Sequence, residues 1–568
     1  MKVSDFIAKK IKELKIFNVP VFQGGAIMHI IDSIGNLKGL KYYCPYHEQS
    51  LAMSVDAYAR LKGFGIGCVT SGPGATNLIT GVCCSYYDSI PCLFFTGQVG
   101  QFHIKKKLSH RQKGFQETDV KNLFSTITKF SYQIKNVEEV NYIIDKAIHI
   151  AKSGRPGPVV IDVPYNIQVS NIDFKKLKKF KPNKKKLEKN KIKRIIKYLI
   201  HNISKEKKAV FIAGGGVTLS KNNKNFLNLV EKLNIPFVTS WNSQDICPYN
   251  HKLYFGSVGR HGNQCANDII EKADIVVSFG FRYAPKAINE NFGKKNKTKI
   301  VALDIDKTEL DECIVELTKK FQVNFDNLFN EIRNINFPKL DNNTWVNKCR
   351  EIKREKFLNN LEDVGNKNLI NPYLFFHKLS FIVSKNAKIF TDAGANLCWC
   401  LTSFKVTKKQ KLISAWGNSP MGYAVSAGIG ACFAEKKQQI ISCIGDGSFL
   451  INIQEMQFLK HHPEVKLKII IFDNQTLGNT KLGTQEAFNG RTHANDAKNG
   501  YYPPDIKKIV KSYDIKYFEL KNNKEINFKM KKFLNYRNTS ILHVKVSSEH
   551  NVIDHSKKYL NSIYNWQN

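Results

Sequence analysis

The feature that most constrains this chain is a repeated series of short, β-rich apolar runs separated by stretches long enough for a helix. Three sets of such runs occur, and many of the runs end in glycine-rich or acidic turns. They cover 66–70, 92–96 and 159–163, then 209–213, 275–279 and 300–304, then 388–391, 440–444, 467–472 and 541–546. Buried strands that alternate with helices form parallel sheets with helices on both faces. The pattern therefore predicts three doubly wound α/β domains with mostly parallel sheets.

Two charged stretches divide the chain. The densest basic run covers residues 174–208, and a second charged stretch covers 348–368. We expect the first half of the basic run to be a linker and the second half a helix that leads into the next domain. The predicted organisation is an N-terminal domain over 1–170, a basic linker over 171–190, a central domain over 191–345 and a C-terminal domain over 346–568.

Composition narrows the class of protein. Lys and Arg total 87 against 48 Asp and Glu, a formal net charge of +39, but much of the excess is diffuse lysine. Because the chain shows no helix-turn-helix, zinc-finger or aromatic-basic RNA motif, we expect no nucleic-acid partner. The 13 cysteines are scattered without zinc spacing, as is typical of a reducing cytoplasm. Residues 1–15 form an amphipathic pattern rather than an export signal, and no window reaches about 20 apolar residues. We expect a soluble, cytoplasmic protein that does not enter a membrane.

The sharpest chemical signal lies in the third domain. Residues 445–448, Gly-Asp-Gly-Ser, follow a predicted buried strand, and the 25 residues 448–472 lead to Asp473 and Asn474 at the end of the next strand. Apolar residues at near-helical spacing predict a connecting helix, which would bring Asp446 beside Asn474. A diphosphate with Mg²⁺ needs hard oxygen ligands and a turn without a Cβ in the way. The segment therefore predicts a diphosphate and magnesium site.

These residues resemble the diphosphate motif of thiamine-diphosphate enzymes, a GDG followed at about this interval by two asparagines. The first asparagine is Asp473 here, whereas the family's side-chain metal ligand falls on Asn474, which is intact. The resemblance implies three metal ligands, which are Asp446, Asn474 and the backbone carbonyl of Thr476. It also implies cofactor contacts from Gly445, Gly447, Ser448, Leu477 and Gly478, and a loop over the diphosphate formed by Gly394, Ala395 and Asn396. The family has Gln-His at the last two of these positions.

An activating carboxylate is the second requirement of this cofactor, because a carboxylate must share a proton with N1′ before the C2 proton can leave. Glu48 lies in a His-Glu-Gln triplet before a stretch of helical character. The order of this triplet, TSGPGATN (70–77), TGQV (96–99) and FQE (115–117) resembles acetolactate synthases and their relatives. The resemblance implies that Glu48 is the N1′ partner. It places Gly24, Gly25, Pro73, Asn77, Phe115 and Gln116 in the same site.

The cofactor must also be bent so that its amino group meets C2. Ser419-Pro420-Met421 resembles the family segment in which a methionine side chain causes this bend. The resemblance implies that Met421 is the wedge and that the carbonyl of Ser419 accepts from the amino group. Core packing is the alternative reading of Met421.

The central domain resembles the part of acetolactate synthase that binds FAD. The matching residues are Gly214, Gly215, Gly216, His261, Gly262, Arg282, Asp304 and Asp306. A glycine-rich turn after a strand suits a dinucleotide phosphate, but three glycines alone are not specific. Relatives have lost FAD while keeping this domain, so both states remain open.

Three departures from acetolactate synthase concern the acceptor pocket. Gly483 stands where the family carries a selective tryptophan, Lys286 replaces an arginine that binds the acceptor carboxylate, and Gln23 replaces a proline. Lysine keeps the charge but not the bidentate fork of arginine. These changes favour an acceptor other than a second simple keto acid, such as a keto sugar.

The resemblance, which covers nearly the whole chain, implies a decarboxylating carboligase. A 2-keto acid such as pyruvate would yield a hydroxyethyl-cofactor carbanion, which is passed to a keto acid or keto sugar. The alternatives are a genuine acetolactate synthase, a simple 2-keto-acid decarboxylase, or an inactive regulatory homologue. The last disagrees with the presence of Glu48, Asp446 and Asn474. The family pattern also implies that Glu48 of one subunit meets the diphosphate domain of another. It therefore implies a homodimer or homotetramer, and it leaves open a small regulatory subunit.

Overall fold

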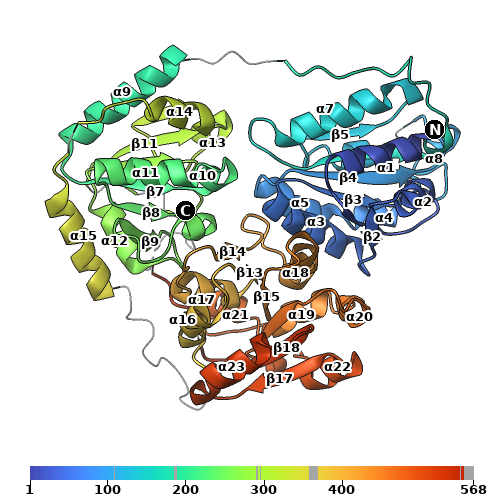
Figure 1. Ribbon diagram of the computed structural model, residues 1–568. Helices are drawn as coiled ribbons and strands as arrows, with labels where there is room; N and C mark the ends of the chain where they lie inside the picture. Colours follow the sequence, from blue (N-terminus) through green and yellow to red (C-terminus); the bar gives the residue numbers. More distant parts are fainter. Residues whose placement is uncertain are drawn as a thin grey trace.

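The computed structural model describes residues 1–107, 109–183, 189–288, 292–294, 296–338, 340–356, 369–550 and 552–555. Within these ranges the chain forms three α/β domains, drawn blue, green and orange to red in Figure 1. Every pairing between named strands is parallel. The predicted fold class is confirmed.

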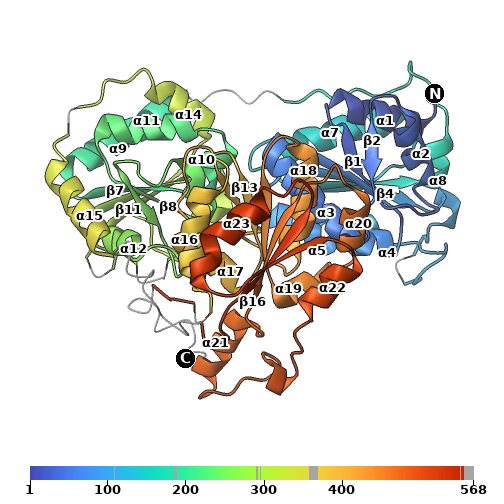
Figure 2. The ribbon, with the colours of Figure 1, turned by 60° about the horizontal axis from the view of Figure 1, so that its bottom comes forward.

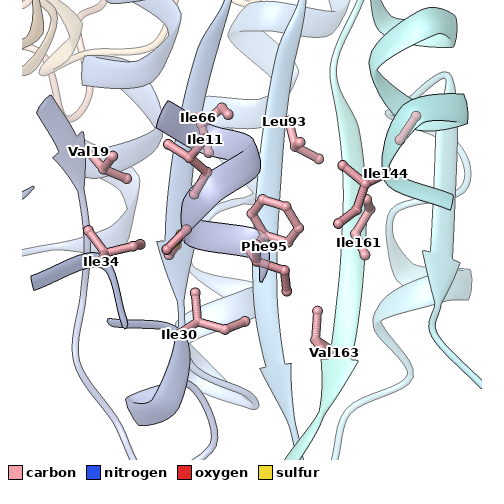
Figure 3. Packing of buried hydrophobic residues seen from close by; sticks show 14 of the residues in the cluster. Ile11, Val19, Ile30, Ile34, Ile66, Leu93, Phe95, Ile144, Ile161 and Val163 are labelled. Carbon is pink, nitrogen blue, oxygen red and sulfur yellow. The ribbon is translucent and has the colours of Figure 1, made fainter. Parts of the chain in front are cut away.

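The N-terminal domain has a four-stranded sheet in the order β3-β4-β6-β5 and a pair β1-β2, which an isolated parallel bridge from Val21 to Cys68 connects to β3. Helices α1 and α2 pack their apolar faces on this sheet, and Figure 3 shows Ile11 of α1 and Ile30 of α2 in the cluster with Ile66, Leu93 and Phe95. The strands are β1 (Asn18–Pro20), β2 (Lys41–Tyr43), β3 (Gly65–Val69), β4 (Cys92–Gln98), β5 (Phe130–Gln133) and β6 (Val159–Pro164). The helices are α1 (Val3–Glu13), α2 (Met28–Asn36), α3 (Glu48–Lys62), α4 (Pro73–Thr76), α5 (Ile79–Tyr87), α6 (Val120–Leu123), α7 (Val140–Lys152) and α8 (Tyr165–Val169).

The central domain follows the basic run, whose residues 184–188 lie outside the described ranges. Its sheet has the order β12-β11-β10-β7-β8-β9. The strands are β7 (Ala209–Ala213), β8 (Phe237–Thr239), β9 (Tyr254–Ser257), β10 (Ile275–Phe279), β11 (Lys299–Asp304) and β12 (Lys319–Gln322). The helices are α9 (Lys189–Lys205), α10 (Gly215–Leu219), α11 (Asn223–Leu233), α12 (Gln264–Glu271), α13 (Lys307–Asp311), α14 (Phe325–Ile332) and α15 (Asn343–Lys356). The helix expected in the second half of the basic run is α9.

The C-terminal domain has a sheet in the order β14-β13-β15-β16-β18-β17. The strands are β13 (Lys388–Thr391), β14 (Lys411–Ile413), β15 (Ile440–Gly445), β16 (Lys468–Asp473), β17 (Lys516–Leu520) and β18 (Ser540–Lys545). The helices are α16 (Pro372–Ile382), α17 (Ala395–Ser403), α18 (Tyr423–Ala434), α19 (Asp446–Ile451), α20 (Glu455–His461), α21 (Gly478–Ala487), α22 (Ile506–Ser512) and α23 (Ile526–Leu534).

Two details differ from the sequence expectation. The connection between β15 and β16 contains two short helices, α19 and α20, instead of the single helix expected. Ile451, which the expected apolar face included, is 48% exposed at the end of α19. The domain boundary expected between residues 345 and 346 falls within α15. This helix packs on the central domain, where the indole N–H of Trp345 donates to the carbonyl of Ala209 at 3.2 Å. The central domain therefore extends to Lys356.

The N-terminal and C-terminal domains pack against each other through α3 and α18 (Figure 2). The hydroxyl of Ser54 donates to the carbonyl of Ser426 at 2.7 Å, and Ser426 donates to the hydroxyl of Ser50 at 3.1 Å. Small residues allow the two helices to approach this closely. Among the helices of the described ranges, none is long and apolar enough to cross a membrane.

Candidate active site

The predicted diphosphate site lies at the carboxyl ends of two adjacent strands, β15 and β16, which pair in register from Ile441↔Lys468 to Gly445↔Phe472. Asp446 begins α19 directly after β15, and Asn474 follows β16. The backbone N–H of Gln475 donates to Oδ2 of Asp446 at 2.8 Å, so the two turns are in direct contact. The expectation that Asp446 and Asn474 lie side by side agrees with this geometry.

The carboxylate of Asp446 is buried and held from both sides. Its Oδ1 accepts from the N–H of Gly447 at 2.8 Å and from the hydroxyl of Tyr501 at 3.2 Å. Burial, followed by the negative charge of Asp473, raises the pKa of Asp446 to about 7. A nearby cation strongly stabilises the charged form of a carboxylate that is poorly solvated.

Asp473, the residue that departs from the family pattern, is an anion with its own partners. Burial raises its pKa, but hydrogen bonds from His543 and Gln475 outweigh this effect and hold the pKa of Asp473 below its ordinary value. The side chain of Asp473 therefore points to β18 and not to the position expected for the metal.

The residues of this turn suit a diphosphate with a divalent cation. Asp446, Asn474 and Thr476 are buried, and all offer hard oxygen atoms. The hydroxyl of Thr476 is buried and has no hydrogen-bond partner among the described residues. Gln475 takes a left-handed φ of 59°, which turns the backbone back toward Asp446. Among the described residues, no cluster of three or more His, Cys, Asp or Glu could hold a metal ion by itself.

A cavity of about 1280 Å³ opens at this edge of the sheet. Its lining contains every residue that the sequence assigns to the cofactor in the C-terminal domain: Gly394, Ala395, Asn396, Ser419, Met421, Gly445, Asp446, Gly447, Ser448, Asn474, Thr476, Leu477 and Gly478. Within the loop after β13, Asn396 accepts from the N–H of Asp392 at 3.2 Å and donates to the carbonyl of Ala393 at 3.1 Å. Asn396 thus braces its own loop.

Glu48 begins helix α3, which His47 caps by accepting from the N–H of Gln49 at 3.0 Å. The side chain of Glu48 is buried, with 6% of the residue exposed, and its Oε2 accepts from Asn77 at 3.0 Å. Asn77 and Pro73 are themselves exposed, so this carboxylate lies just beneath the surface. The arrangement presents a buried carboxylate at an open face of the domain.

Other predicted residues of the N-terminal domain surround the same face. Gly24 packs against the side chain of Thr70, and Gly25 is exposed beside it. Gln116 has a φ of 61° and packs closely on Gly72. A Cβ added to Gly72 would lie 2.9 Å from the Cβ of Gln116. The neighbouring Phe115 is 86% exposed. A side chain of this size in open solvent marks a surface that another molecule can cover.

The two groups of predicted site residues do not come together within one chain. None of the assigned N-terminal residues lines the cavity that contains the diphosphate turn; those residues are Gly24, Gly25, Glu48, Pro73, Asn77, Phe115 and Gln116. The cavity is bordered instead by N-terminal residues 87–89 and 152–156 and by the central domain.

The central-domain residues assigned to FAD divide into two groups. Gly215, Gly216, His261, Arg282 and Asp304 line the cavity, whereas Gly214, Gly262 and Asp306 do not. A Cβ on Gly214 would lie 2.0 Å from the carbonyl oxygen of Gly280, and one on Gly216 would lie 2.8 Å from its Cα. These two glycines are therefore required by backbone packing, whatever the cavity binds.

Two charged residues that line this part of the cavity, Arg155 and Glu309, form an ion pair, and Asp306 joins them from outside the lining. Asp306 lies 3.0 Å from Nη1 of Arg155, which also contacts Glu309 at 2.6 Å. Burial raises the pKa of Asp304 to about 6 and lowers the pKa of His261 to about 4. The cavity accommodates a dinucleotide by volume, but its lining does not by itself select FAD.

The two acceptor residues are also separated. Lys286 lines the cavity, whereas Gly483 lies on α21 outside it. Asn479 and Thr480, one turn before Gly483, do line the cavity, and Asn479 contacts Sγ of Cys398 at 3.6 Å. Sequence reasoning missed these polar residues, together with Tyr501 and Arg155. The first two continue the Asn474–Gly478 motif and could have been found from it, but Tyr501 and Arg155 reach the site only through tertiary packing.

A carboxylate turn at the ends of two parallel strands, a cavity above it and a second buried carboxylate in another domain define a thiamine-diphosphate enzyme. Three matches to known families agree. They are described as "Thiamine pyrophosphate enzyme, N-terminal TPP binding domain" over residues 1–123, "central domain" over 196–319 and "C-terminal TPP binding domain" over 392–544.

Relatives over nearly the full length narrow the class. The chain is 30% identical over 528 residues to an acetolactate synthase large subunit of Lactococcus lactis, covering 92% of this chain and 89% of that protein. It is 31% identical over 561 residues to a probable acetolactate synthase large subunit of Methanococcus aeolicus, covering 94% and 90%. Identity to acetolactate synthase 1 of Nicotiana tabacum, a chloroplastic protein, is 29% over 484 residues, covering 84% and 71%. The chain belongs to the acetolactate-synthase-like family of thiamine-diphosphate-dependent enzymes, which form carbon–carbon bonds.

Proposed function

We propose that this enzyme decarboxylates a 2-keto acid, with pyruvate as the first candidate, and joins the remaining fragment to a carbonyl acceptor. The observation that carries the proposal is the cavity, because it gathers all the C-terminal cofactor residues at the carboxyl ends of β13, β15 and β16. Ligands of open α/β sheets bind at this edge. Bound thiamine diphosphate supplies a carbon nucleophile and a sink for the electrons left by loss of CO₂.

The C-terminal residues bind and orient the cofactor in this proposal. Asp446, Asn474 and the carbonyl of Thr476 would hold Mg²⁺, and the turn at Gly447 and Ser448 would lie against the phosphates. Met421 supports the bent conformation from one side, and the carbonyl of Ser419 accepts from the amino group. Both residues line the cavity next to the diphosphate turn.

Glu48 is the proton-sharing carboxylate at N1′. Glu48 is buried, and within the described residues its side chain accepts one hydrogen bond, from Asn77 to Oε2, which leaves Oε1 available for a ring nitrogen. Because Glu48 and its neighbours do not line the cavity of their own chain, we propose that a second copy of the chain supplies them. The exposed Phe115 beside Gln116 supports a homodimer as the minimal active unit, with a tetramer as the alternative.

The acceptor is either a second keto acid, as in acetolactate synthesis, or a larger polar carbonyl compound such as a keto sugar. The polar lining formed by Lys286, Asn479 and Thr480 supports the larger polar acceptor. FAD remains a candidate occupant of the central part of the cavity, and the visible flavin absorbance of the purified protein decides this. Two of the relatives are named as large subunits, so co-purification of a small chain is a further test.

The test of the proposal is CO₂ release from pyruvate by the purified protein with thiamine diphosphate and Mg²⁺, with products identified by mass spectrometry. Acetolactate as the sole product would identify a synthase of the usual specificity. Decarboxylation without acetolactate would direct the assay to keto-sugar acceptors. The absence of cofactor-dependent CO₂ release from any 2-keto acid would overturn the proposal.

A further inference from the structure

The segment 414–422 joins β14 to α18 and carries Ser419 and Met421, the two residues assigned above to the cofactor's aminopyrimidine. Ser419 has a φ of 47°, and Gly422 follows with a φ of 86°. Residues with side chains seldom occupy the left-handed region, so the conformation at Ser419 requires support from contacts around it. The structure shows where that support comes from.

The first support is Asp88 of the N-terminal domain, at the end of α5. Its Oδ2 accepts from the N–H of Trp416, and its Oδ1 accepts from the N–H of Gly417, both at 2.8 Å. The guanidinium of Arg60 approaches Oδ2 of Asp88 at 2.6 Å. One carboxylate thus binds two successive amides of another domain while an arginine holds it in place, a geometry with short, charge-assisted hydrogen bonds.

The second support lies at the other end of the segment. Tyr423, the first residue of α18, donates its hydroxyl to Oδ2 of Asp56 at 2.6 Å. Asp56 also accepts from Nε of Arg60 at 2.7 Å and from the hydroxyl of Ser85 at 2.9 Å. Arg60 therefore lies between two carboxylates, one at each end of the segment. All three charged side chains are at most 10% exposed.

Contacts between these two ends reinforce the arrangement. Asn418 donates to the carbonyl of Thr80 at 3.1 Å. Gly417 approaches α5 so closely that a Cβ would lie 2.6 Å from Cβ of Tyr87 and 3.2 Å from Oδ1 of Asp88. The N-terminal domain therefore contacts residues 416–418 and 423, and the interval between them contains Ser419 and Met421.

We propose that Asp88 is a positioning residue of this enzyme: together with Arg60 and Asp56 it clamps segment 416–423 and thereby sets the Ser419 carbonyl and the Met421 side chain against the cofactor. The inference rests on the proposed function for its catalytic consequence. Asp88 acts through the segment because both of its oxygens are occupied by protein N–H groups. The N-terminal domain thus has a structural role toward the diphosphate domain of its own chain, separate from the role of Glu48.

The first arm of the test uses the protein without cofactor. In Asp88→Asn the side-chain carboxamide has one acceptor oxygen in place of two. One of the two hydrogen bonds from the N–H groups of Trp416 and Gly417 is therefore lost. We expect hydrogen–deuterium exchange of the amides in 416–418 to accelerate at least tenfold, while α18 beyond Ser426 exchanges as in the wild type. The matched control is Glu435→Gln, which breaks the Lys62–Glu435 ion pair of 3.0 Å across the same pair of domains but far from the segment in sequence. Unchanged exchange in Asp88→Asn would overturn the clamp.

The second arm measures the consequence for the cofactor. We expect the C2–H of bound thiamine diphosphate to exchange with deuterium at least tenfold more slowly in Asp88→Asn, with less than a twofold change in cofactor affinity by calorimetry. A purely structural role would weaken both together. A wild-type exchange rate at C2, despite a loosened segment, would overturn the positioning role. A wild-type protein that binds no thiamine diphosphate would overturn the proposed function and leave the first arm as the test of the clamp.

A second variant, Gly417→Ala, keeps all charges and tests the proposal even if Asp88→Asn does not fold. The added methyl group must displace the segment, because it would lie 2.6 Å from Tyr87. Gly417 is exposed, so the fold should tolerate the change. We expect the same selective loss of C2 exchange with retained affinity, and a wild-type C2 exchange rate in this variant as well would overturn the proposal.

Discussion

Oδ2 of Asp473 lies 2.7 Å from Nε2 of His543 on the neighbouring strand β18. Both side chains are buried, and the hydroxyl of Tyr517 on β17 contacts the other ring nitrogen of His543 at 2.8 Å. Asp473 stands where the family pattern has asparagine. A buried carboxylate at this position requires a hydrogen-bonding partner, and His543 provides it. The departure from the pattern is therefore compensated inside the sheet, away from the expected metal ligands.

A double-mutant cycle tests this compensation. His543→Leu alone should lower the free energy of unfolding by about 3 kcal/mol, because it leaves the Asp473 carboxylate buried without its partner. Adding Asp473→Asn should recover part of that loss, with a coupling energy of roughly 1–3 kcal/mol. Urea denaturation of the cofactor-free protein measures both values. Additive effects of the two changes would show that the pair does not interact.

Glu48→Gln should reduce deuterium exchange at C2 of the bound cofactor by about a hundredfold or more, because glutamine cannot share a proton with N1′. The fold should persist, since the amide can still accept from Asn77. Proton NMR of the cofactor measures the exchange, and circular dichroism checks the fold. An exchange rate equal to that of the wild type would refute the role of Glu48.

Asp446→Asn should weaken Mg²⁺-dependent cofactor binding by roughly a hundredfold, since the amide lacks the charge that a divalent cation requires. Isothermal calorimetry with and without Mg²⁺ measures the effect. The matched control is Asp514→Asn, which removes an exposed carboxylate that is paired with Lys460 at 2.7 Å in the same domain. Equal affinities in Asp446→Asn and the control would contradict the metal site.

Glu455 should make stability depend on pH. It is buried in α20, and its Oε1 accepts from the N–H of Tyr46, two residues before Glu48. Burial raises the pKa of Glu455 from 4.5 to about 7. The folded protein thus binds this proton more tightly than the unfolded chain, so the free energy of unfolding should fall as pH rises from about 4.5 to about 7, by on the order of 3 kcal/mol.

Glu455→Gln isolates this contribution from those of other buried acids. The free energy of unfolding of this variant should decline less than that of the wild type between these pH values. The difference between the two free energies should be constant above about pH 7. Thermal unfolding of the cofactor-free proteins at a series of pH values measures the difference. Parallel pH profiles would exclude a raised pKa of Glu455.

Lys286→Gln should raise the KM for an anionic acceptor about fivefold, the effect of losing roughly 1 kcal/mol from an exposed cation. The rate of CO₂ release from the donor should stay within twofold of the wild type, because Lys286 lies in the central domain and not at the diphosphate turn. Lys224→Gln, on the exposed face of α11, is the matched control. An unchanged KM would remove Lys286 from the acceptor site.

Strand prediction succeeded where burial on both faces left a continuous apolar run. The runs at 209–213, 275–279 and 388–391 coincide with β7, β10 and β13. Among the missed strands, β5, β12 and β17 lie at sheet edges with partly exposed residues, and their sequences, such as Lys-Lys-Phe-Gln in β12, do not alternate clearly. The pattern also missed β1, β2, β8, β9 and β14, which are only three or four residues long. Edge strands depend on one neighbour, and this pairing is not encoded in a local pattern.

The amino-acid sequence by itself determined the class of fold, because buried strands and helices leave local apolar patterns. It also predicts the diphosphate turn around Asp446 from residue types at a short spacing, and its resemblance to acetolactate synthases implies the role of Glu48. Tertiary structure alone decided that His543 balances Asp473 and that Asp88 holds the segment before Met421. These relationships join groups far apart in sequence. They exist only because helices and sheets pack in one arrangement that buries charges with their partners.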